Sequence, residues 1–223
     1  RQVPLQHLVG RCPWRDLELE VGPAVLIPRQ ETELLVDVAI ACFEAAAPPE
    51  RWADLGTGSG CVALALARHW PRSCGWAVDC SPEALAVAER NAVALGLDQS
   101  IALQWCEGVW WQPLLPMSGQ LDLVVSNPPY IPTAVVDELE PVVRDHEPRL
   151  ALDGGSDGLD ALRSIIEAAP SMLAPGGWLV LEHHHDQSAA VAELLRAAGL
   201  QERRQVRDLE GQLRFAVARR SNP

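Results

Sequence analysis

Residues 52–60 have the sequence WADLGTGSG, in which a short apolar stretch leads directly into three glycines at alternate positions. Such apolar stretches are typical of strands buried in a parallel sheet, and the CVALALA that follows has the pattern of a buried helix. The stretch therefore predicts a strand, a glycine-rich turn and a helix, which form the first half of a β-α-β unit. In sheets built from such units, ligands bind beyond the carboxyl ends of the strands.

Strands and helices continue to alternate along the rest of the chain. Further strands are predicted at 75–79, 101–105, 121–126, 177–182, 204–207 and 213–218. Helices are predicted at 82–95, between the cap residue Ser81 and Gly96, and at 159–172 and 188–198. This order predicts an α/β fold with a mostly parallel seven-stranded sheet, helices on both faces and a C-terminal antiparallel hairpin.

The residues before Arg51 give weaker signals. Residues 25–28, VLIP, resemble a short strand, and residues 31–47 have helical spacing. We predict that residues 1–24 form a hairpin or a linker and that residues 25–223 form the main domain.

The composition limits the classes of partner. The chain has 223 residues and a formal net charge of −12. Proteins that bind duplex nucleic acid usually present a basic surface to the phosphates, so stable nucleic-acid binding is not expected. No apolar stretch approaches the roughly 20 residues that span a bilayer, and the first residues lack the pattern of a signal peptide. We therefore predict a cytoplasmic protein without a membrane partner.

Metal binding is not expected either. The six cysteines have no paired close spacing, which argues against a zinc site or a redox CxxC. Three consecutive histidines, His183 to His185, have no carboxylate at a spacing that would complete a ligand set. The sequence DGGSDG at residues 153–158 does not match the spacing of an EF-hand loop.

Two features suggest a nucleoside-containing ligand. The glycine turn lets a ligand approach the backbone closely, although its GxGxG spacing differs from the GxGxxG typical of dinucleotide sites. Asp79 ends the next predicted strand, where an acidic side chain can accept hydrogen bonds from two ribose hydroxyls. From its position alone, Asp79 could equally cap the following helix or lie in a solvated loop.

A third feature is the sequence SNPPY at residues 126–130, which follows the predicted strand 121–126. Two prolines fix the backbone and donate no N–H, so the strand must stop and the carbonyls of Asn127 and Pro128 are free to face a substrate. The Asn127 side chain can accept hydrogen bonds from a planar NH2 group, and Tyr130 can pack on its plane. Without the other two features, a strand terminator with a core-packed tyrosine would explain this stretch.

Together, DLGTGSG (54–60), VDCS (78–81) and SNPPYI (126–131) resemble S-adenosylmethionine-dependent methyltransferases that act on planar amino groups. The narrower resemblance is to the bacterial and organellar protein-(glutamine-N5) methyltransferases of peptide chain release factors. It rests on PLQHLVG (4–10), VLIPRQETELLV (25–36) and EPRLALDGGSDGLD (147–160), and it continues to residue 220. The resemblance implies a Rossmann-like class I methyltransferase fold for residues 25–223. It also implies methyl transfer to the glutamine of the Gly-Gly-Gln loop of class 1 release factors, in support of translation termination.

The resemblance implies roles for individual residues. S-adenosylmethionine would be held by Gly56, Thr57, Gly58, Ser59, Gly60, Asp79, Trp110 and Asn127. The acceptor glutamine would be held by Asn127, Pro128, Pro129 and Tyr130, of which Asn127, Pro128 and Tyr130 are the expected catalytic residues. Trp111 is the alternative to Trp110, because family members usually have an acidic residue before this aromatic position and this chain has Val109.

The chain departs from the family pattern at two places. Family members carry a small helical domain that helps to recognise the release factor, ahead of the segment matching residues 4–10, so residues 1–24 are expected to be a remnant without that domain. Gln30 replaces the proline of the usual IPRPETE stretch, in which Arg29, Glu31 and Glu33 are possible supports of the site.

Two other functions remain open from the sequence. A DNA or RNA adenine-N6 methyltransferase would clamp an exocyclic amine in the same way, although the acidic charge and the flanking stretches argue against it. The chain could also be a truncated, non-catalytic module that only binds the cofactor.

Overall fold

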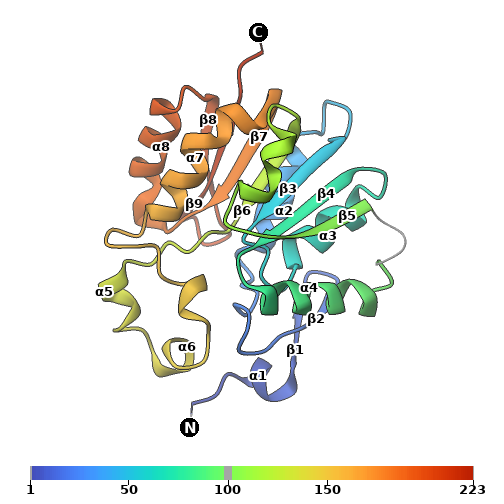
Figure 1. The fold of residues 1–223 in the computed structure, drawn as a ribbon. Helices are drawn as coiled ribbons and strands as arrows, with labels where there is room; N and C mark the ends of the chain where they lie inside the picture. The colour runs from blue at the N-terminus through green and yellow to red at the C-terminus, as the bar shows by residue number, and fades with distance from the viewer. Residues whose placement is uncertain (1, 98–101, 223) are drawn as a thin grey trace.

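The strand that leads into the glycine turn lies at the centre of the sheet. The computed structural model describes residues 2–97 and 102–222. Among these residues, seven strands form one sheet in the order β5-β4-β3-β6-β7-β9-β8, in which β9 runs in the opposite direction to all the others (Figure 1). The strands are β3 (Arg51–Leu55), β4 (Cys74–Asp79), β5 (Ala102–Glu107), β6 (Leu121–Ser126), β7 (Leu173–Glu182), β8 (Gln201–Arg207) and β9 (Leu213–Arg219). The predicted mostly parallel sheet with a closing hairpin is confirmed.

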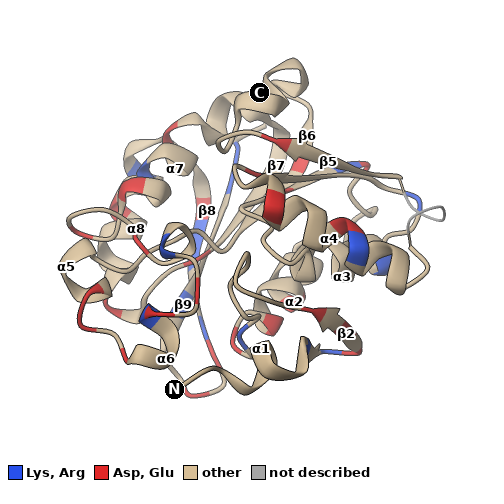
Figure 2. Ribbon diagram, turned by 60° about the horizontal axis from the view of Figure 1, so that its bottom comes forward, with Lys and Arg blue, Asp and Glu red and all other residues tan. Residues whose placement is uncertain are grey.

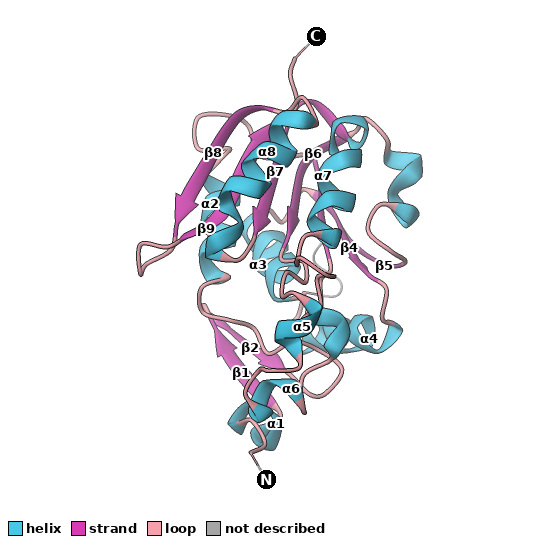
Figure 3. Cartoon of the chain, turned by 90° about the vertical axis from the view of Figure 1, so that its left-hand side faces the viewer, coloured by secondary structure: helices cyan, strands magenta, loops and turns pink. Residues whose placement is uncertain are grey.

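Helices cover both faces of this sheet (Figure 3). One face packs against α2 (Glu33–Ala41), α3 (Cys61–His69) and α4 (Pro82–Ala94), and the other against α7 (Asp160–Met172) and α8 (Ser188–Ala197). Successive strand residues alternate between the two layers: Trp52 of β3 packs with α3, and the next residue, Ala53, packs with α7. Both faces of the central strands are therefore buried, which explains their continuous apolar sequences.

The N-terminal residues form a short helix and a hairpin that pack on the main sheet's helices. The helix is α1 (Leu5–Val9), and the hairpin pairs β1 (Arg11–Trp14) with β2 (Leu17–Glu20). Trp14 is only 1% exposed and belongs to the same hydrophobic cluster as α3. Residues 11–20 thus form a hairpin, while the division of the chain after residue 24 stays a prediction.

The strand predicted at residues 25–28 is wrong. These residues form a turn and an extended segment, and Val25 and Ile27 are buried without pairing to a strand. The backbone N–H of Ile27 donates to the carboxylate of Glu147 at 3.3 Å, and that of Val25 donates to the Gly22 carbonyl. The apolar pattern that resembles a strand therefore reflects only the burial of the Val25 and Ile27 side chains.

Several predicted boundaries also move. Helix α2 ends at Ala41, well before residue 47, because the chain turns at Phe43 ahead of Pro48 and Pro49. Strand β7 begins at Leu173, and β8 begins at Gln201, both earlier than predicted. Residue 101, the predicted start of β5, lies outside the described residues.

The segment between β6 and α7 forms a separate lobe beside the carboxyl ends of the strands (Figure 1). It contains α5 (Thr133–Val136), α6 (Pro141–Arg144) and the short 3-10 helix η2 (Arg149–Ala151). Two more 3-10 helices, η1 (Gln112–Met117) and η3 (His185–Gln187), lie elsewhere in the fold. Within the described residues, no helix combines the length and apolarity needed to cross a membrane.

Candidate active site

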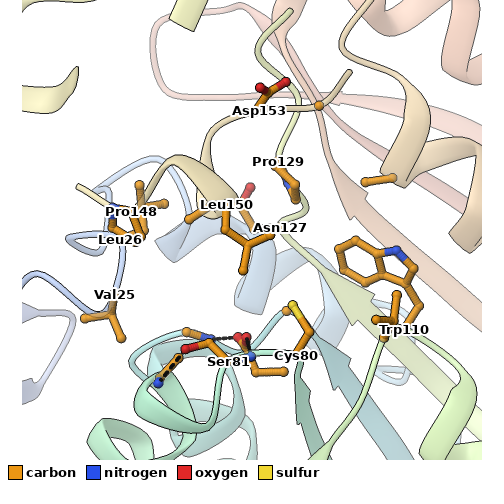
Figure 4. Close-up of a pocket in the computed structure, with 18 of the residues that line it drawn as sticks. Val25, Leu26, Cys80, Ser81, Trp110, Asn127, Pro129, Pro148, Leu150 and Asp153 are labelled. Atoms are coloured by element: carbon orange, nitrogen blue, oxygen red, sulfur yellow. Dashed lines mark hydrogen bonds between the residues drawn. The ribbon is translucent and has the colours of Figure 1, made fainter. Parts of the chain in front are cut away.

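A cavity of about 510 Å³ lies at the carboxyl ends of the central strands, between the sheet and the lobe that follows β6 (Figure 4). The predicted site residues that line it are Gly56, Gly58, Asp79, Trp110, Asn127 and Pro129. The three sequence features therefore meet in one cavity, as the position of ligand sites in parallel sheets requires. None of its lining residues is an arginine within residues 2–97 and 102–222. Figure 2 shows arginines along β8, at the edge of the sheet.

The glycine turn is held in one conformation by buried hydrogen bonds. Gly56 and Gly58 have φ values of 76° and 55°, in the left-handed region that favours glycine. The Thr57 hydroxyl donates to Asp54 at 2.7 Å, and burial raises the pKa of Asp54 to about 7. A fixed turn presents its backbone to a ligand without losing conformational entropy on binding.

The five predicted residues of the turn divide into two groups. Gly56 and Gly58 line the cavity, whereas Thr57 and Ser59 are buried and are not part of its lining. Gly60 also faces away from the cavity, because a Cβ atom there would lie 3.0 Å from that of Ala88 on α4. Close packing of α3 on α4 and a left-handed φ of 82° therefore both favour glycine at this position.

Asp79 is fixed at the end of β4 by two backbone donors. Its carboxylate accepts from the N–H of Gly58 at 2.9 Å and from the N–H of Ser81 at 3.0 Å. Burial raises the pKa of Asp79, and these backbone hydrogen bonds oppose the change. The Ser81 hydroxyl, which accepts from Ala84 N at 3.1 Å, caps the helix. Asp79 thus lines the cavity while another residue supplies the cap.

Trp110 stands over the glycine turn on the opposite side of the cavity from Val25 (Figure 4). Its backbone has a φ of 48°, a left-handed conformation that costs a non-glycine residue about 1–3 kcal/mol. A Cβ atom added to Gly56 would come within 3.3 Å of the Trp110 ring. Trp111, the alternative, is only 7% exposed and packs in the core under α7.

The SNPPY residues face two adjoining spaces. Asn127 and Pro129 line the main cavity, while Asn127, Pro128 and Tyr130 line a neighbouring space of about 60 Å³. The structure shows no hydrogen bond to the Pro128 carbonyl from any residue within 2–97 and 102–222. That oxygen is therefore available as an acceptor, as the two prolines predict.

Backbone hydrogen bonds from the lobe after β6 hold the SNPPY stretch in place. The sequence gives no sign of this arrangement. Ile131 N donates to the Leu152 carbonyl, and Gly154 N donates to the Ile131 carbonyl. The amide nitrogen of Gln187 donates to the carbonyls of both Tyr130 and Gly158. The DGGSDG loop therefore supports the SNPPY stretch. Glycine is needed where the backbone of the loop contacts the backbone of that stretch.

The three possible supporting residues have different positions. Arg29 lines the smaller space and pairs with the buried Glu147 at 2.8 Å. Glu33 accepts from Arg15 N at 3.0 Å and so holds the N-terminal hairpin. Glu31 is half-buried and near enough to Glu182 to raise the pKa of that carboxyl.

Comparisons with known proteins agree with this arrangement. The family described as "Methyltransferase small domain" matches residues 31–144. A release factor glutamine methyltransferase of Prochlorococcus marinus is 53% identical, over 98% of this chain and 74% of that protein. The chain belongs to the release factor glutamine methyltransferase family. A second member, from Thermosynechococcus vestitus, is 50% identical over 97% of this chain and 74% of its own length.

Solved structures support the fold of this methyltransferase. The ribosomal protein L11 methylase of Lactobacillus delbrueckii subsp. bulgaricus has a TM-score of 0.62 to this chain, with 22% identity over 90% of this chain and 83% of that one. The fold is that of the class I methyltransferases, whose methyl donor is S-adenosylmethionine. The cavity fits this donor, because Gly56 leaves the space that a Cβ atom would fill and Asp79 supplies a fixed carboxylate.

Proposed function

We propose that this methyltransferase methylates the side-chain amide nitrogen (N5) of the glutamine in the Gly-Gly-Gln loop of class 1 peptide chain release factors. The names of its relatives support a release factor as the substrate. The observation that carries the proposal is the pair of acceptors at Asn127 and Pro128, beside a cavity of the size of a nucleoside cofactor. A cytoplasmic location stays a prediction from the sequence.

In this proposal the main cavity holds S-adenosylmethionine, which supplies an electrophilic methyl group on sulfur. Gly56 and Gly58 line this cavity and would allow the cofactor to approach the backbone, Asp79 would accept from its ribose hydroxyls, and Trp110 would pack on its adenine. The smaller space, lined by Pro128 and Tyr130, receives the glutamine side chain. Thr57 and Ser59 maintain the turn through their buried side chains, and Gly60 lets α3 pack closely on α4.

The chemistry rests on positioning. A carboxamide nitrogen is a poor nucleophile, because its lone pair is delocalised into the carbonyl group. Asn127 and Pro128 would accept its N–H groups, which would position the nitrogen for methyl transfer and stabilise the positive charge that develops on it. No general base is required before methyl transfer, and the nitrogen loses its extra proton afterwards.

Replacement of Trp110 by alanine is expected to weaken cofactor binding by roughly tenfold, because the stacking of a base on an aromatic ring contributes about 1–3 kcal/mol. Isothermal titration with S-adenosylmethionine measures this change in Kd. Trp110→Phe retains a ring and should recover most of the affinity. A Kd for Trp110→Ala equal to that of the unmodified protein would show that Trp110 does not contact the cofactor.

The proposed reaction is tested with methyl-labelled S-adenosylmethionine and three separate acceptors. These are a class 1 release factor, the same factor with Gly-Gly-Ala in its loop, and adenine-containing DNA. Label on the unmodified factor alone is the expected result. Label on DNA would support the adenine-N6 alternative, which the absence of arginine from the described cavity lining does not favour. Cofactor binding without label on any acceptor would support the non-catalytic alternative.

A further inference from the structure

We infer that Thr32 and Glu182 are positioning residues, which fix the end of the Asn127 amide that faces the acceptor nitrogen. This inference rests on the proposed function. It concerns a chain of three polar side chains from different parts of the fold: the residue before α2, the last residue of β7 and the first residue after β6.

The first link joins Asn127 to Thr32. The Asn127 side-chain nitrogen, Nδ2, lies 3.1 Å from the Thr32 hydroxyl oxygen. Thr32 is 2% exposed and stands at the N-terminal cap position of α2, yet its side chain makes no capping hydrogen bond. Its oxygen accepts from Asn127 and it does not cap this helix, so its hydrogen is free to be directed to an acceptor elsewhere.

The second link joins Thr32 to Glu182. Glu182 is 1% exposed, and its Oε1 atom accepts from the Tyr130 hydroxyl at 3.2 Å. Its other oxygen, Oε2, is buried and has no partner within ordinary hydrogen-bond distance in the described part of the chain. Burial raises the pKa of Glu182 to about 7, and the nearby Thr32 hydroxyl opposes this increase. In the inferred arrangement, the Thr32 hydroxyl donates to this open Oε2 acceptor.

The direction of these hydrogen bonds determines the orientation of Asn127. When Thr32 donates to the Glu182 carboxylate, its oxygen can only accept from Asn127, so the Nδ2 end of the amide is held at Thr32. The Oδ1 end then faces the cavity, where it can accept from the substrate N–H. With the amide turned the other way, its own N–H groups would face those of the substrate and oppose binding of the developing ammonium.

Thr32→Val tests this role, because valine keeps the shape of the side chain and removes the hydroxyl. We expect kcat for methylation of the release factor to fall about tenfold, with the KM for the factor and the Kd of S-adenosylmethionine nearly unchanged. Thr32→Ser restores the hydroxyl and should restore kcat. The melting temperature of each variant establishes that it is folded.

Two results would overturn the inference. The first is a normal kcat in Thr32→Val. The second is a Thr32→Ser variant as slow as Thr32→Val, which would show that the shape of the side chain matters and its hydroxyl does not. An unmodified protein that binds S-adenosylmethionine but does not methylate the factor would instead overturn the proposed function, and the inference with it. The assay therefore separates the two failures.

The pH profile of kcat provides a second readout. The groups that act on Glu182 are Thr32 and Glu31 before α2, Tyr130 after β6 and Arg214 on β9. Below a pKa of about 7 the carboxyl gains a proton, becomes a donor to Thr32 and reverses the hydrogen-bond direction. We expect kcat to fall roughly tenfold from about pH 8 to about pH 6.

Glu182→Gln should lower kcat at pH 8 and remove this low-pH limb, because its amide nitrogen donates to Thr32 at every pH. The matched control is Glu167→Gln, which neutralises an exposed carboxyl on α7 and should retain the normal pH profile of kcat. A low-pH limb that survives in Glu182→Gln would contradict the assignment to Glu182.

Discussion

Asn127→Ala is expected to lower kcat by roughly 10²-fold or more while the protein remains folded and binds S-adenosylmethionine. Asn127 lines both the main cavity and the smaller space beside it, so its amide lies where the cofactor and the glutamine meet. Alanine removes an acceptor for the N–H groups of the substrate, whose hydrogen bond strengthens as positive charge develops on the nitrogen. Single-turnover methylation of the release factor measures this step directly.

The control variant removes an amide side chain that does not line the cavity. Gln104 lies on β5 with its side chain exposed, and Gln104→Ala should methylate at the normal rate. Isothermal titration with the cofactor then shows whether Asn127→Ala still forms the binary complex. Near-normal turnover by Asn127→Ala would remove the basis for placing the acceptor amide at SNPPY.

The central part of the fold could be predicted from the sequence because its signals are local. The strand at 121–126 is mostly apolar, is buried at every position except Asp122, and ends where Asn127 and two prolines stop the ladder. Ser81, Pro82 and Gly96 similarly bound α4 through contacts within a few residues. In such cases the periodicity and the terminating residues specify the same element.

The residues that support Asn127 and Tyr130 are far from them in the sequence, and no local sequence pattern predicts these contacts. Asn127 contacts Thr32 across 95 residues of sequence, and Tyr130 contacts Glu182 across 52. From the sequence, a glutamate at the end of an apolar strand with a buried carboxyl cannot be distinguished from one with a solvated carboxyl. Burial of Glu182 arises only because β9, the SNPPY stretch and the segment before α2 converge on it.

The DGGSDG loop presents a related case: its sequence only argued against an EF-hand site, and the structure shows why glycine is required there. Gly158 has a φ of 75°, and a Cβ atom there would collide with the Tyr130 carbonyl oxygen. The same atom would lie 2.6 Å from the amide nitrogen of Gln187, which holds Tyr130 and Gly158 together. Any side chain at this position must therefore displace the backbone of the SNPPY stretch.

We expect Gly158→Ala to lower kcat by roughly 10²-fold, because a displacement of about 1 Å in substrate-positioning groups can cost that much rate. The variant should also be destabilised by about 1–3 kcal/mol, from the strained φ and the overpacked contact. Gly199→Ala is the matched control: Gly199 has the same φ of 75°, but nothing lies within 4 Å of an added Cβ atom. Both variants should lose stability in urea unfolding, while only Gly158→Ala loses turnover. Equal turnover in the two would show that backbone strain, and not displacement of Tyr130, is the main effect of the substitution.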